Sequence, residues 1–269
     1  MNADAAPGRS PLVLGSALGL VLGASIMILL HETSHAVAGA LQGYRPLQLP
    51  FAVDYTPEPT VPAHVRALLA GPVFSLVSGV LGLVVDRVAR PFQGRPFWRM
   101  AWLWTVFASI QEGLGYLQVT ALMPAGDTAQ AFTLLGLPPA AFIAASIVGW
   151  ALLPLTAWVF SVPMREMAAT VADRQALATW GWLLGTGALC VLMGLYVLVS
   201  PISDPGVIIA VLAGAASIGI YAPMSMMFHS SAADAERAPR MPWPPRGGLL
   251  LLGALIGINA VLSLGVLWP

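Results

Sequence analysis

Residues 11–30 read PLVLGSALGLVLGASIMILL, a run without a charged residue, and His31-Glu32-Thr33-Ser34-His35 follows it directly. A helix needs about 20 apolar residues to cross the hydrocarbon core of a bilayer, so this run predicts a transmembrane helix. We expect its helical character to continue to Gly43. The run is longer than the about 7–15 apolar residues of a signal peptide, so we expect it to be retained as the first span.

Composition extends this prediction to the whole chain. Of its 269 residues, 58% are hydrophobic and 9% are charged, whereas a soluble domain carries about 25% charged residues. Seven predominantly apolar runs are long enough to span a bilayer: 11–30, 67–85, 100–123, 140–162, 176–200, 205–228 and 247–268. The sequence therefore predicts an all-α integral membrane protein with about seven transmembrane helices. We divide it into a short tail (1–10), a catalytic membrane core of three spans (11–137) and a C-terminal four-span region (138–269).

The arginines predict the orientation. If the seven spans alternate, ten of the twelve arginines lie on the side of the N-terminus, and only Arg45 and Arg66 lie on the other side. The positive-inside rule then makes the N-terminus cytoplasmic, in what we expect to be a bacterial cell membrane. The apolar spans make the lipid bilayer the expected partner. Acidic and basic residues balance at twelve each, so we expect no nucleic acid partner.

The motif His31-Glu32-Thr33-Ser34-His35 predicts a metal site. Residues at i and i+4 share one face of a helix, so both imidazoles can reach the same ion. Zinc lowers the pKa of a bound water to about 7, and Glu32 stands close enough to take its proton. Ionisable side chains at membrane depth are costly without such a role.

A catalytic zinc keeps three protein ligands, so a third is needed. The candidates are Asp54, His64, Glu112, Asp127 and His229. Depth in the seven-span arrangement favours Asp127, which follows the outer end of the third span. Asp54 and His64 belong to the adjacent loop, so depth alone does not exclude them. His229 falls on the opposite side of the membrane and is therefore disfavoured as a ligand. Glu112 lies about 16 Å along the helix from the end of that span, too deep to reach the same ion.

The metal motif, followed by Ala36 and Ala38 at the end of a span, resembles the site-2 protease family of intramembrane metalloproteases. Residues 70–75, AGPVFS, look like the Gly-Pro motif of that family. They supply Gly71 and Pro72, with Ser75 where asparagine is common. Apart from the family, Gly71 and Pro72 are also typical of a close helix contact and a kink.

Residues 122–127, LMPAGD, are similar to the family's Pro-x-x-Asp segment, and the resemblance covers roughly residues 20–137. It implies that Asp127 is the third zinc ligand, three residues after Pro124, and that the substrate is a transmembrane protein. The family's asparagine before this proline is missing, and Gln118 or Thr120 occupies its neighbourhood. The resemblance therefore leaves the group that orients substrate or stabilises the oxyanion unidentified. Members often place the metal motif nearer the cytosol, whereas the arginines place it nearer the outside.

A β-like segment follows the first span. Alternate positions in it are apolar: Leu47, Leu49, Phe51, Val53 and Tyr55. This alternation predicts a strand, and Pro50 restricts such a strand to a sheet edge. The segment either holds an unwound substrate by strand addition or forms a loop that caps the site.

Glu112 lies near the middle of the third span, where a charge is expensive. It is either a proton relay or polar contact to the site, or a structural residue bonded to Gln118 or a neighbouring span. We favour the structural interpretation.

Two functions compete. The first is a membrane-embedded zinc endopeptidase that uses His31, His35, Asp127 and the general base Glu32. The second is a non-catalytic protein of the same fold that acts as a metal-dependent regulator or partner-binding scaffold. The carboxylate of Glu32 favours the enzyme, because a scaffold has no chemical need for it. A proton-coupled transporter lacks support, because the sequence shows no repeated halves.

Overall fold

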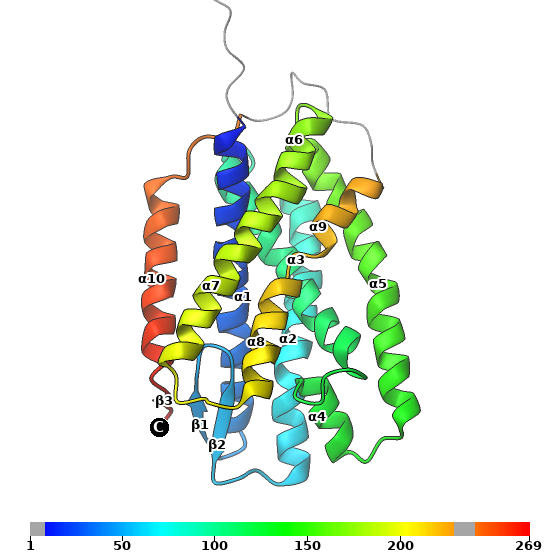
Figure 1. Ribbon diagram of the computed structural model, residues 1–269, viewed down its shortest axis with the longest axis vertical. Helices are drawn as coiled ribbons and strands as arrows, with labels where there is room; N and C mark the ends of the chain where they lie inside the picture. The colour runs from blue at the N-terminus through cyan, green and yellow to red at the C-terminus, as the bar shows by residue number, and fades with distance from the viewer. Residues whose placement is uncertain (1–8, 229–239) are drawn as a thin grey trace, which may run out of the picture.

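The computed structural model describes residues 9–228 and 240–269 and is mostly helical (Figure 1). The elements, in chain order, are α1 (Ser10–Ala40), β1 (Arg45–Gln48), β2 (Val53–Thr56), α2 (Val61–Ala89), α3 (Pro96–Val119), α4 (Asp127–Leu134), α5 (Pro139–Glu166), α6 (Val171–Gln175), the π-helical stretch η1 (Ala176–Gly181), α7 (Trp182–Val199), α8 (Pro205–Ser217), α9 (Tyr221–Met224), the 3-10 turn η2 (Ser225–Met227), α10 (Arg246–Leu262) and β3 (Val266–Leu267).

In the part of the chain that the structure describes, five helical segments are long and apolar enough to cross a membrane, which is the character of a multi-pass membrane protein. They are Ser10–Ala40, Val61–Ala89, Pro139–Glu166, Val171–Val199 and Pro205–Met227. Each contains or closely matches one of the predicted runs. The outward face of α2 is apolar, with side chains such as Val77 and Leu81 more than half exposed. Such a surface suits lipid better than water.

The other two predicted spans differ from this group. The predicted run 247–268 is helical only from Arg246 to Leu262, a helix of 17 residues, because the chain then turns into β3. The predicted run 100–123 is helical from Pro96 to Val119, and the amides of Leu122 and Met123 then bond back to the Val119 carbonyl in a turn.

Helix α3 occupies the centre of the molecule. It packs against α1, α2 and α5, and it buries Leu103, Trp104 and Phe107 almost completely. Since protein surrounds it, α3 can carry polar residues such as Gln111 and Gln118 that a lipid-facing helix would exclude. This position explains why α3 is less apolar than the five long segments.

Glycine allows α1 and α3 to approach each other closely. A Cβ atom placed on Gly23 of α1 would lie 2.6 Å from the backbone nitrogen of Thr105 on α3. The two backbones are therefore in contact at this level, as in helix pairs of membrane proteins that use small residues at their interface.

The β-like segment is a hairpin rather than the single strand that the alternation predicted. Strands β1 and β2 pair antiparallel, and the Leu49 amide bonds to the Ala52 carbonyl to close the turn between them. Pro50 lies in this turn, where its missing N–H removes no ladder hydrogen bond. The strand β3, from the far end of the chain, pairs with the other side of β1, so the sheet order is β2-β1-β3.

The short helix α4 brings the chain back toward α1 after α3. Val65 and Leu68 of α2 form a small apolar cluster with Ala131 of α4. This packing holds the first turn of α4, which contains Asp127, beside the C-terminal half of α1. Tail residues 1–8 and His229 lie outside the described residues, so predictions that concern them are not addressed by the structure.

We predict that Gly23→Ala destabilises the protein by about 1–3 kcal/mol, because the new methyl group overpacks the contact with α3. Denaturant titration of the detergent-purified protein measures this change. The matched control is Gly253→Ala in α10, where an added Cβ meets no atom within 4 Å. Alanine should leave that helix as stable or stabilise it by about 0.5–1 kcal/mol. Equal stability changes in the two variants would contradict the close approach of α1 and α3.

Candidate metal centre

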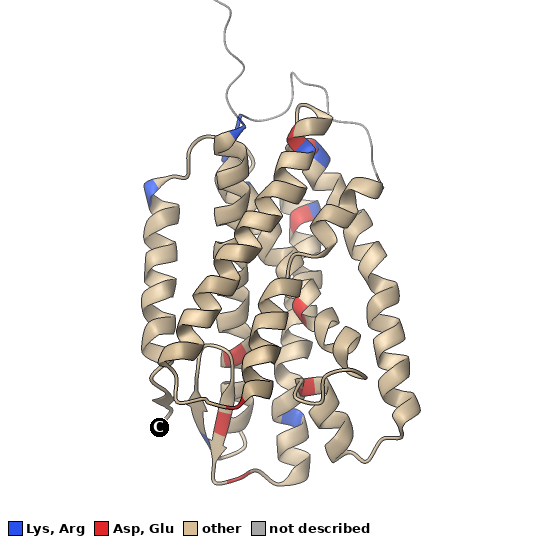
Figure 2. Ribbon diagram, in the orientation of Figure 1, with Lys and Arg blue, Asp and Glu red and all other residues tan. Residues whose placement is uncertain are grey.

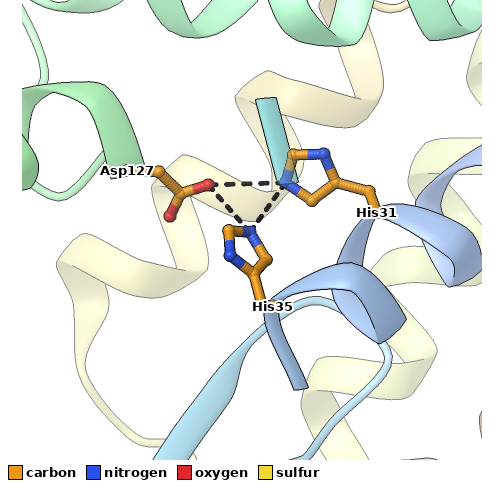
Figure 3. Close-up of side chains that lie close together, drawn as sticks. All are labelled: His31, His35 and Asp127. Atoms are coloured by element: carbon orange, nitrogen blue, oxygen red, sulfur yellow. Dashed lines mark hydrogen bonds and ion pairs between the residues drawn. The ribbon is translucent and has the colours of Figure 1, made fainter. Parts of the chain in front are cut away.

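Among the described residues, three side chains from two helices far apart in the sequence converge at one point (Figure 3). His31 and His35 lie one turn apart on α1, and Asp127 opens α4. The Nε2 atoms of the two histidines are 3.0 Å apart. An Asp127 carboxylate oxygen, Oδ2, lies 3.4 Å from the first of these nitrogens and 3.2 Å from the second. Both histidines are buried, so this buried group could hold a metal ion.

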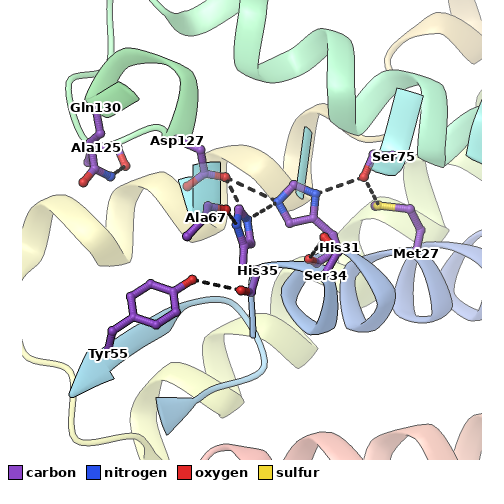
Figure 4. A network of polar contacts seen from close by, with 10 residues as sticks. All are labelled: Met27, His31, Ser34, His35, Tyr55, Ala67, Ser75, Ala125, Asp127 and Gln130. Atoms are coloured by element: carbon purple, nitrogen blue, oxygen red, sulfur yellow. Dashed lines mark hydrogen bonds and ion pairs between the residues drawn. The ribbon is translucent and has the colours of Figure 1, made fainter. Parts of the chain in front are cut away.

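The outer nitrogens of both imidazoles are fixed by hydrogen bonds (Figure 4). The Nδ1 atom of His35 lies 2.7 Å from the Ala67 carbonyl oxygen. Because a carbonyl only accepts, this Nδ1 must carry the proton. The Nδ1 atom of His31 lies 2.9 Å from the Ser75 hydroxyl, which itself donates to the sulfur of Met27. In this arrangement the serine oxygen accepts a hydrogen bond from the Nδ1–H group of His31.

These tautomers leave an unshared electron pair on each Nε2, directed at the other histidine and at the Asp127 carboxylate. Three electron-rich atoms that face one point need a positive charge between them, which either a proton on one Nε2 or a metal ion supplies. Ligands placed about 2.0–2.2 Å from one tetrahedral zinc ion are separated by about 3.3–3.6 Å. The observed separations of 3.0, 3.2 and 3.4 Å are close to that range. The donor set therefore could hold a metal ion with tetrahedral geometry.

Gly71 of α2 lies against the convergent nitrogens. A Cβ atom at this position would overlap the Nε2 atoms of both His31 and His35. The neighbouring Pro72 is buried inside α2, and its carbonyl oxygen would lie 2.9 Å from a Cβ on Gly113 of α3. The predicted close helix contact at Gly71 and Pro72 is thus present, and it forms one wall of the metal centre.

Glu32 is buried and lines the same cavity as His35 and Asp127. This cavity has a volume of about 410 Å³. Its walls come from α1, the hairpin, α2, α3, α4 and the turn before it, α7 and α8. The part played by α8, whose Ala210 and Gly214 line the cavity, was not predicted, because nothing in that apolar sequence distinguishes it from other spans.

The hairpin is attached to the metal-binding turn of α1. The Tyr55 hydroxyl donates to the His35 carbonyl oxygen at 3.1 Å. Burial is the main cause that raises the pKa of Tyr55, so this hydroxyl stays protonated as a donor. On β1, the amide of Gln48 donates to the hydroxyl of Thr33 at 3.1 Å, and its oxygen accepts from the indole of Trp268.

The remaining predicted site residues have different locations. Glu112 lines the cavity, but the atoms that converge belong to His31, His35 and Asp127. The predicted bond from Glu112 to Gln118 is replaced by another pair: the buried Gln118 accepts from Gln111 and donates to the Gly149 carbonyl of α5. Gln118 thus supports helix packing and is not part of the cavity wall.

Pro124 is exposed in the turn between α3 and α4, where it precedes Asp127 without lining the cavity. The alternative ligands Asp54 and His64 both line the cavity wall but do not belong to the convergent group.

No protein-family model matches this chain, and no match was found among curated proteins or solved structures.

We predict that Ser75→Ala lowers zinc affinity by about 10- to 100-fold, because His31 loses the acceptor that orients its ring. Competition with a chelator measures the affinity. Ser78→Ala is the matched control, since the Ser78 hydroxyl bonds to a backbone carbonyl one turn away and does not touch the histidines. The same affinity in both variants would show that the Ser75 contact has no role in metal binding.

Proposed function

We propose that this protein is an intramembrane zinc metalloprotease that hydrolyses peptide bonds of transmembrane or membrane-proximal substrates. One observation carries the proposal: a His-His-Asp group lies at a cavity inside a bundle of long apolar helices, and Glu32 lines that cavity together with His35 and Asp127. Two histidines and one carboxylate form a typical catalytic zinc set, which leaves a position open for water.

Each residue has a distinct task in this reaction. His31, His35 and Asp127 would hold the zinc ion, which when bound lowers the pKa of a water ligand to about 7. Glu32 accepts a proton as the water attacks the scissile carbonyl carbon, and returns it to the leaving nitrogen as the C–N bond breaks. Ser75 and the Ala67 carbonyl keep the imidazoles in the tautomer that faces the ion.

The hairpin supports the expectation of strand addition. Strand β1 is paired on both sides, whereas β2 is the edge of the sheet and contributes Val53, Asp54 and Tyr55 to the cavity wall. A substrate segment paired with β2 would be extended, which exposes its peptide bonds to the metal centre.

We further propose that α3 and α10 also cross the bilayer, giving seven spans. Helix α3 is long enough, at about 36 Å, and its polar residues are enclosed by other helices. Figure 2 shows most basic residues at the end of the molecule where α1 and α10 begin, opposite the hairpin and α4. The positive-inside rule makes that end cytoplasmic and places the metal centre in the outer half.

We expect about one zinc ion per chain in detergent-purified wild-type protein, measured by elemental analysis. Glu32→Gln should keep the zinc, because its ligands are intact, yet lower cleavage of a quenched fluorescent transmembrane peptide by about 10²-fold or more. The control His35→Ala should lose both the zinc and the activity. Zinc-free wild type would refute the proposal, and a zinc-bound wild type without activity would favour the metal-dependent regulator or scaffold.

We expect reporter fusions after Arg95, Arg174 and Arg240 to report the cytoplasm. Fusions near Asp127 and Asp204 should report the opposite side. The reason is that arginine-rich loops stay in the cytoplasm, and the loops around Arg95, Arg174 and Arg240 carry most of the arginines. Paired fluorescence and phosphatase reporters measure both sides independently. The reverse pattern would mean that the metal centre opens toward the cytosol.

A further inference from the structure

We infer that Tyr116 is a further catalytic residue, whose hydroxyl donates a hydrogen bond to the oxyanion formed from the scissile carbonyl. This inference rests on the proposed function and concerns the group that the sequence left unidentified. Attack by water forms a C–O bond and moves the carbonyl π pair onto oxygen, which becomes negatively charged. A neutral donor beside that oxygen stabilises the transition state more than the ground state.

The position of Tyr116 carries the argument. Its ring is stacked on the ring of His31, with centroids 5.2 Å apart and an interplanar angle of 9°. The ring also lies beside the backbone just before Asp127, since a Cβ on Gly126 would lie 3.6 Å from its Cδ1 atom. Tyr116 therefore stacks on one of the candidate metal ligands, lies beside the residue that precedes another, and lines the same cavity as Glu32.

Other donors in the cavity wall are already committed. Among the described lining residues, three donate to backbone carbonyl groups: Tyr55 to His35, Gln130 to Ala125, and Ser217 to Gly214. His64 is the remaining side chain with an N–H, and its ring lies 6.3 Å from that of Tyr55, on the hairpin side. Tyr116 is thus the hydrogen-bond donor of the cavity wall that lies beside the candidate metal ligands. The side-chain amide of Gln118 donates to the Gly149 carbonyl and does not line the cavity.

Tyr116→Phe tests the inference, because it removes only the hydroxyl. We expect kcat on the quenched transmembrane peptide to fall about 10²-fold, while KM and zinc content stay near wild type. The matched control is Tyr221→Phe. It removes a buried hydroxyl that has no hydrogen-bond partner within residues 9–228 and 240–269, and the ring packs among Trp104, Phe107 and Phe160. This control should keep wild-type kcat.

A second measurement does not depend on turnover. A phosphinate peptide, whose tetrahedral anion imitates the intermediate, should bind Tyr116→Phe about 10-fold or more weakly than wild type, as measured by calorimetry. Tyr221→Phe should bind it normally.

Three outcomes would overturn the inference. Unchanged kcat and phosphinate binding in Tyr116→Phe would show that the hydroxyl is not used. A parallel loss of zinc and activity would show that Tyr116 only positions Asp127. A large loss in His64→Gln, with Tyr116→Phe near wild type, would assign the donor to His64. Zinc-free wild type refutes the proposed function itself, whereas active wild type with an equally active Tyr116→Phe refutes this inference alone.

Discussion

The convergence of two imidazole nitrogens and a carboxylate oxygen at one point is the constraint on which the rest of this structure depends. His31, His35 and Asp127 meet there, an arrangement that a positive charge between them, a metal ion or a proton on an imidazole, makes favourable. Satisfying it demands acceptors for both outer imidazole nitrogens, and α2 supplies both through Ser75 and the Ala67 carbonyl. It also demands that α2 pass so close that no side chain fits between, which is why glycine stands at the contact. One helix thus serves as wall and as hydrogen-bond partner.

The polar side chains of α3 explain why this helix lies in the centre of the bundle. A carboxylate and two amides would be costly against lipid, but α1, α2 and α5 enclose this helix. Gln111 donates to Gln118 there, Gln118 donates to the Gly149 carbonyl of α5, and Glu112 lines the cavity. One turn further on, the helix places the ring of Tyr116 against His31. Enclosure therefore permits a helix with several polar side chains in the middle of the molecule.

Local geometry explains what could be predicted from the sequence. The i, i+4 spacing places two histidines on one helix face in any context, and depth along alternating spans identified Asp127 as their partner. The hairpin was mistaken for one strand because apolar alternation continues through a turn that Pro50 occupies. Long-range packing could not be predicted from the sequence. The rotation of α3 against its neighbours decides the direction of the Gln118 side chain and the stacking of the Tyr116 ring on His31.

The sheet beside the cavity has a consequence for the order of synthesis. Trp268 bonds to Gln48 across a separation of 220 residues, so β3 can join the hairpin only after every helix between them has been made. By contrast, the metal-binding group is complete once the ribosome has passed Asp127. The residues that could hold a metal ion are therefore all synthesised early, whereas β1 has a partner on only one side until residue 268 has been made. The candidate site and the complete sheet beside it thus depend on parts of the chain that are synthesised at very different times.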